Sequence, residues 1–146
     1  MKPNPGIKSK LLSYGVMAIL LGSASFFSHA AENKESIAQT PGGISYVSGG
    51  VGDESIDRLN MMVSEFNLKL VFAMKSGEYV SGVNVMINDT KGKTILDTTS
   101  EGPWLLTRLP AGNYQIVASF AGKAEMRQVA VGTNQLKTVD FRWASE

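Results

Sequence analysis

The sequence predicts a mainly β protein, a seven-stranded antiparallel sandwich with one N-terminal amphipathic helix. Apolar and polar side chains alternate with a period of two in seven short segments between residues 67 and 143. Clusters of Gly, Pro, Asn and Asp separate these segments at close spacing, which is typical of a sandwich. Residues 53–66 instead have the period of three to four that indicates a helix.

Residues 1–30 have the pattern of a secretory signal peptide. A basic stretch precedes an apolar run at 11–22, and small residues suited to cleavage follow at Ser28 and Ala30. The run is too short for a good membrane span, so an uncleaved anchor is only the alternative interpretation. The chain has no cysteine, which excludes a lipoprotein signal. We expect a bacterial-type export signal and a periplasmic or secreted protein with no integral membrane segment after cleavage.

Cleavage after Ala30 changes what the composition implies. It removes Lys2, Lys8 and Lys10 and no acidic residue, so the mature chain is slightly acidic. That balance argues against nucleic acid or an anionic membrane surface as a partner. Cleavage also removes the only histidine, His29. The mature chain then has no imidazole base, thiol nucleophile, disulfide or His/Cys metal site, and we expect no cofactor and no metal.

Two segments precede the predicted helix. Residues 31–41 are polar and aperiodic, and we expect a disordered leader. Residues 42–52 form a glycine-rich loop with embedded apolar residues, which predicts a segment that packs on the rest of the fold. The functional alternative is a binding loop formed by Tyr46, Gly49 and Gly50 beside the helix N-terminus, although acidic residues there would repel an anion.

The predicted helix, 53–66, completes the region 42–66 that precedes the sandwich. Asp53 is a suitable N-cap, and acidic residues follow in the first turn, where the helix dipole favours them. Apolar residues at spacings of three and four form one stripe, as at Leu59 and Phe66. A single helix cannot bury such a stripe alone, so we expect it to lie against the sheet.

Seven strands are predicted to follow the helix, within a domain at residues 67–144. They cover 67–73, 83–88, 94–98, 104–109, 114–120, 124–131 and 136–143. Residues that favour turns lie between them, as at 88–93 and 121–123. The apolar phase slips between Met126 and Val129, which predicts a bulge.

Three runs in this domain resemble a known family. Residues 81–92 contain Gly-x-Val-x-Val before a polar glycine turn, residues 97–104 are Thr-rich before Gly-Pro-Trp, and residues 109–114 are Leu-Pro-Ala-Gly-Asn-Tyr. Together they resemble the carboxypeptidase regulatory-like domain, a transthyretin-like or prealbumin-type, Ig-like sandwich. The resemblance implies the fold and a core or corner role for Tyr114. It implies no activity, because such domains are appended to many unrelated proteins.

The same fold also hosts a hydrolase of 5-hydroxyisourate, from which this chain departs. That family relies on histidines and a C-terminal Tyr-Arg-Gly-Ser, whereas this mature sequence has no histidine and ends in Phe-Arg-Trp-Ala-Ser-Glu. The resemblance therefore does not extend to that activity.

Catalytic candidates among the other residues are weak. Paired carboxylates would have to come from Asp89, Asp97, Glu101 and Glu125, which fall in turns or on polar strand faces and are expected to be solvated surface charges. Ser48 or Ser55 would need Lys69 or Lys75 as a base, because no histidine is present. We therefore expect no enzyme and no catalytic residue, and keep a cryptic hydrolase as the least favoured reading.

Binding is the function that the sequence favours. We expect an exported, non-catalytic accessory protein that engages a protein partner through loops or a sheet edge, at 94–98 or 136–143. The alternative is a carbohydrate or cell-wall binding module that stacks sugars on Trp104 and Trp143. Large aromatics in alternating strands are more often core residues, so both tryptophans are also core candidates.

Overall fold

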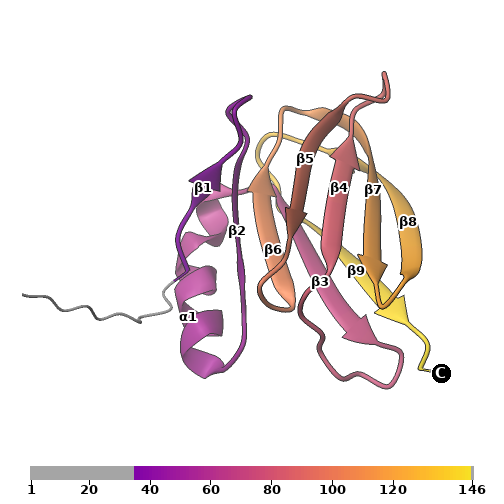
Figure 1. Ribbon diagram of the computed structural model, residues 1–146. Coiled ribbons are helices and arrows are strands. Elements are labelled where there is room, and N and C mark those ends of the chain that lie inside the picture. The colour runs from indigo at the N-terminus through magenta and orange to yellow at the C-terminus, as the bar shows by residue number, and fades with distance from the viewer. Residues whose placement is uncertain (1–34, 146) are drawn as a thin grey trace, which may run out of the picture. The chain divides into compact units, whose positions relative to one another are not determined.

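Two β-sheets and one helix make up residues 35–145, the part of the chain that the computed structural model describes (Figure 1). The strands are β1 (Ala38–Gln39), β2 (Ser45–Gly49), β3 (Leu68–Met74), β4 (Asn84–Asn88), β5 (Thr94–Thr99), β6 (Trp104–Arg108), β7 (Gly112–Phe120), β8 (Lys123–Val131) and β9 (Lys137–Trp143). The first sheet has the order β1-β2-β6-β3-β9 and the second β5-β4-β7-β8. The predicted signal peptide, 1–30, lies outside the described residues.

The mainly β, sandwich-like fold is confirmed, but the predicted strand count is wrong. Each of the seven predicted strands is present, as β3 to β9, and two further strands precede them. β1 lies within the supposed disordered leader, and β2 lies within the glycine-rich loop. β2 depends on pairing with distant residues, since it aligns Val47 with Leu106 of β6, and β1 pairs in turn with β2. A local pattern rich in Gly and Ser cannot reveal such a pairing.

The prediction that all strand pairs are antiparallel is wrong. β3 and β9 run parallel, from Leu68 opposite Lys137 to Met74 opposite Trp143. Between them the chain builds the whole second sheet and also β6, a crossover long enough for a parallel pair to form. The first and last strands of the predicted domain are therefore neighbours.

The helix is not N-terminal to the strands, because β1 and β2 come before it. α1 spans Asp53–Met62, and a 3₁₀ turn, η2, continues over Val63–Glu65. Its N-cap is Gly52 at φ 88°, not Asp53, and no side chain caps the helix. Glycine suits this position because the left-handed backbone carries no Cβ penalty there. Asp53 instead lies in the first turn.

The helix packs on the outer face of the first sheet, as its apolar stripe predicted. Leu59 and Phe66 form a buried cluster with Val47 of β2 and Leu106 of β6, and Trp104 lies at its margin. The first sheet is therefore covered by apolar contacts on both of its faces.

The main core lies between the two sheets. Its buried members are Leu68, Leu70, Phe72, Val83, Val85, Ile87, Leu96, Leu105, Leu109, Tyr114, Ile116, Ala118, Val129, Val131, Phe141 and Trp143. Tyr114 is buried as the resemblance implied, and its hydroxyl donates to the carbonyl oxygen of Pro110 at 2.6 Å. Strand alternation delivers these residues to one face of each sheet.

The predicted bulge in β8 is wrong. β7 and β8 pair without a break from Gly112 opposite Val131 to Phe120 opposite Lys123. Met126 is an exposed apolar residue on the outer face, which is why the apolar phase of the sequence seemed to slip. The only register shift between β4 and β5 is instead at Ile87/Asn88.

Asn67, which lies between the helix and β3, forms hydrogen bonds to the segments that precede β7 and follow β8. Its side chain is buried, and its Nδ2 donates to the carbonyl oxygens of Leu109 (2.8 Å) and Gly132 (2.9 Å). The backbone N–H of Leu109 donates to its Oδ1 at 2.9 Å. Its own backbone N–H donates to the carbonyl oxygen of Thr107, and its carbonyl accepts from Lys137. Every polar atom of this buried amide therefore has a partner.

We expect Asn67→Ala to lower the free energy of unfolding by about 3 kcal/mol, because it deletes three hydrogen bonds and leaves buried backbone groups unsatisfied. Urea denaturation measures this loss. Asn60→Ala, at an exposed position of α1, is the matched control and should change stability by less than about 0.5 kcal/mol. Equal effects of the two substitutions would contradict the role given to Asn67.

Candidate functional site

The two tryptophans proposed as a sugar platform face opposite sides of the first sheet. Trp143 belongs to the core between the sheets and is only 2% exposed. Its ring packs against Phe72, Phe120 and Phe141, and its Nε1–H donates to the carbonyl oxygen of Lys123 at 3.0 Å. Trp104 belongs to the outer cluster under the helix. The pair therefore forms no joint stacking surface.

Trp104 is half-buried and is covered by a cation. The Nζ of Lys69 lies 3.4 Å from the centroid of its ring. Burial lowers the pKa of Lys69, and the negative charge of Asp140 partly offsets this shift. The cation–π contact engages Lys69, the residue that a Ser-Lys pair would need as its base.

The predicted binding loop is held by Glu35, an acidic residue whose side chain is largely covered. Ser55 of α1 donates a hydrogen bond from its hydroxyl to the carboxylate of Glu35, and the Nε of Arg58 donates to the same carboxylate at 2.5 Å. The backbone N–H of Gly50 donates to the hydroxyl oxygen of Ser55 at 2.7 Å. A Cβ added at Gly49 would lie 2.6 Å from the Cγ of Glu35. Gly49 is therefore packed against Glu35, whereas Gly50 lies against Pro103 and Trp104.

The carboxyl group of Glu35 is held in its charged form. Burial by itself would raise its pKa, but the hydrogen bonds from Arg58 and Ser55, with the charge of Arg58, outweigh burial and lower the pKa. The side chain is 9% exposed. The first described residues of the chain are thus anchored to the start of the helix.

Gly102 allows a second close approach at the same loop. A Cβ at this position would overlap the backbone carbonyl group of Gly49. Nearby, the backbone N–H of Glu101 donates to the hydroxyl oxygen of Ser48 at 2.9 Å. These contacts join the β5–β6 connection to the end of β2.

A groove lies between β2 of the first sheet and β5 of the second. It has a volume of about 190 Å³ and is lined by Glu35, Ser36, Ala38, Tyr46, Val47, Ser48, Thr98, Thr99 and Glu101. Of the predicted binding residues, Tyr46 forms part of this wall, and Gly49, Gly50 and the tryptophans do not. Both strands at the groove are near sheet edges, since β1 covers only Ser45 and Tyr46 of β2.

The edge strands β8 and β9, one from each sheet, are linked by side-chain contacts. The guanidinium of Arg127 lies 5.3 Å from the ring centroid of Phe141, and Trp143 bonds to the carbonyl of Lys123. Side chains of β8 therefore cover the edge of the core beside β9. The strand edges that the sequence proposed for partner binding, β5 and β9, are both true edges, but they differ in this respect.

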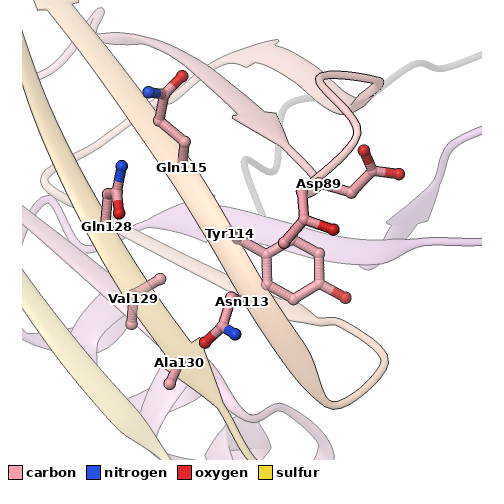
Figure 2. A pocket seen from close by; sticks show the side chains of 8 residues that line it. Asp89, Asn113, Tyr114, Gln115, Gln128, Val129 and Ala130 are labelled. Atoms are coloured by element: carbon pink, nitrogen blue, oxygen red, sulfur yellow. The ribbon is translucent and has the colours of Figure 1, made fainter.

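A larger pocket with several polar side chains lies on the second sheet where β7 begins and β8 ends (Figure 2). Its volume is about 410 Å³, and it is lined by Asp89, Thr90, Asn113, Tyr114, Gln115, Gln128, Val129 and Ala130. Desolvation raises the pKa of Tyr114, with a smaller contribution from the negative charge of Asp89. The sequence patterns did not single out this pocket, because its carboxamides look like ordinary polar positions of two strands.

The predicted carboxylate candidates are not brought together. Asp89 accepts the backbone N–H groups of Lys91 and Lys93 at its Oδ1, both at 2.9 Å, and so holds the β4–β5 turn. Glu125 pairs with Arg127 at 3.3 Å on β8. Within residues 35–145 no three His, Cys, Asp or Glu side chains are placed to hold a metal ion. No helix in the same range is long and apolar enough to span a membrane.

Glu35 is the residue at this site that the sequence reasoning missed. It lies in a polar segment that resembles a leader, and its partners Ser55 and Arg58 are 20 and 23 residues further along the chain. No local spacing links them, so only the folded arrangement reveals the contact.

Comparison with known proteins adds no relative to this description. No protein-family model matches the chain, and a search of curated proteins returns no significant match.

We expect Glu35→Gln to destabilise the protein at neutral pH by about 1 kcal/mol, because it removes the negative charge that faces Arg58 and one of the two oxygens that accept from Arg58 and Ser55. Since the folded-state pKa of Glu35 is lowered, this contribution is present above the ordinary carboxyl pKa and disappears as the pH falls through the folded-state value. Urea denaturation of both proteins between neutral and acid pH measures it. A difference that stays constant with pH would contradict the assignment.

A second prediction concerns the close approach at Gly102. Gly102→Ala should lower the free energy of unfolding by about 2 kcal/mol or more, because the new Cβ forces the backbone of Gly49 to move. Gly132→Ala is the control, since a Cβ there meets no atom within 4 Å. Thermal melts of the two variants separate the outcomes, and similar melting temperatures would show that the two segments do not touch.

Proposed function

We propose that this is an exported, non-catalytic binding protein that engages a protein partner by adding a strand of the partner to β5. The observation that supports this most is the open edge of β5 beside the groove that contains Tyr46. An edge strand presents unpaired backbone N–H and C=O groups, and an extended peptide can pair with them while its side chains enter an adjoining groove.

The charge of the edge strands also favours β5. Natural edges are commonly protected by charged side chains or by being very short. β8 and β9 each carry several charged residues and β1 has two residues, whereas Asp97 is the one charge in the six residues of β5. β5 is therefore the least protected edge among the described strands.

The groove offers the side-chain contacts that strand addition requires. It is lined by Thr98 and Thr99 of β5, by Tyr46 and Ser48 of β2, and by Glu101 of the β5–β6 connection. Threonine favours strand conformation, and the hydroxyl groups accept and donate hydrogen bonds. A short extended segment with small or polar side chains matches a space of about 190 Å³.

Other features agree with this proposal and support it less specifically. The N-terminal pattern of residues 1–30 predicts export, and the runs that resemble a carboxypeptidase regulatory-like domain suggest a module that acts by binding. Carbohydrate binding by the two tryptophans gains no support from the structure, because Trp143 is buried in the core.

Photo-crosslinking in the native host tests the proposal. A photoreactive amino acid at Thr99, in the groove wall, should capture a protein partner, whereas the same amino acid at Met61, 82% exposed on the helix, should not. A captured partner should then be displaced by a synthetic peptide copying its crosslinked segment. Capture at Met61 but not at Thr99, or capture at neither, would contradict strand addition at β5.

A further inference from the structure

The pocket where β7 begins and β8 ends is lined by several carboxamide side chains, and we propose that it binds a neutral, hydroxyl-rich glycan. The side chains that carry the proposal are the carboxamides of Asn113, Gln115 and Gln128 (Figure 2). The site is separate from the groove at β5, because the two have no lining residue in common.

The pocket forms because the two strands that flank β7, β4 and β8, extend to different points along it. β4 pairs with β7 only as far as Asn88 opposite Gln115, whereas β8 continues to Gly112 opposite Val131. The chain of β4 turns away at Asp89, so the backbone of Asn113 and the following residue has no strand beside it on that side. The turn residues Asp89 and Thr90 form the wall of the pocket on that side.

Carboxamides cross the sheet at the floor of this pocket. Strand pairing places Gln115 directly opposite Gln128 on one side and opposite Asn88 on the other. In Figure 2 the side chains of Gln115 and Gln128 extend from their adjacent strands toward the same side. The Nε2 of Gln115 contacts the sulfur of Met126 at 3.2 Å, and a thioether is a weak acceptor that a hydroxyl oxygen would outcompete.

The kinds of side chain decide the class of ligand. A carboxamide both donates and accepts hydrogen bonds, and so does each hydroxyl of a sugar. None of the residues that line the pocket is Lys or Arg, and its one charged residue, Asp89, is acidic. An anionic ligand is therefore disfavoured, and a neutral polyol fits.

The geometry also predicts the strength of binding. The volume of about 410 Å³ lies within the range of small-ligand pockets. Tyr114 is buried, with only 8% of the residue exposed, so it offers little stacking surface, and its hydroxyl already donates a hydrogen bond to the carbonyl oxygen of Pro110. Hydrogen bonds in an open, wet site give weak affinity, and we expect dissociation constants on the order of millimolar.

Nuclear magnetic resonance of the isotope-labelled protein tests this site. The probes are cellohexaose, maltohexaose and chitohexaose, with hexagalacturonate as the anionic comparison. At least one neutral hexasaccharide at about 10 mM should shift the side-chain amide signals of Gln115 and Gln128. No shift with any of the three, or a stronger response to hexagalacturonate, would overturn the proposal.

Substitution then locates the binding. Gln115→Ala and Gln128→Ala should each weaken the affinity about fivefold, the effect of one neutral hydrogen bond. Gln128→Glu keeps the shape but removes the donor, and should weaken it similarly. Asn60→Ala removes an exposed carboxamide from the helix and should leave affinity unchanged. Undiminished binding by all three pocket variants would exclude this site, whatever the outcome of crosslinking at β5.

Discussion

The buried side chain of Asn67 is the constraint on which the arrangement of this protein most depends. It stands where the chain passes from the helix on the outer face into β3 of the core. Through its amide it ties together Leu109, before β7, and Gly132, after β8. Its backbone bonds to Thr107 and Lys137 set the register of β3 against both neighbours. A buried amide satisfied at every atom permits one arrangement of these segments and penalises the others.

The two sheets differ in how many of their faces are covered by apolar contacts. The first sheet has apolar contacts on both faces, to the second sheet inside and to α1 outside. The second sheet has such contacts on one face only, and its outer face carries uncharged residues such as Gln115 and Gln128. Both surfaces proposed for binding therefore involve the second sheet, one at its β5 edge and the other where β7 begins and β8 ends. The helix covers the outer face of the first sheet, so that face is not exposed to a ligand in the same way.

The segment around Glu35 links stability to the candidate groove. The carboxylate of Glu35 anchors the first described residues to Ser55 and Arg58, and the same residue lines the groove between β2 and β5. Gly49 allows the close packing of Glu35, and Gly50 has a positive φ and donates its backbone N–H to Ser55, so both glycines have structural roles.

The sequence by itself determined the mainly β class, the positions of β3 to β9 and the amphipathic helix, because each depends on local alternation or turn chemistry. It also placed β5 and β9 at edges. The burial of Tyr114 was expected only from the family resemblance. Tertiary structure alone decided the pairing of β2 with β6, the parallel pairing of β3 with β9 and the contacts of Glu35. It also assembled the pocket at Gln115 and Gln128. All of these join residues far apart in the chain, and the free energy that selects them comes from non-local packing and hydrogen bonding that leave no periodic trace in the sequence.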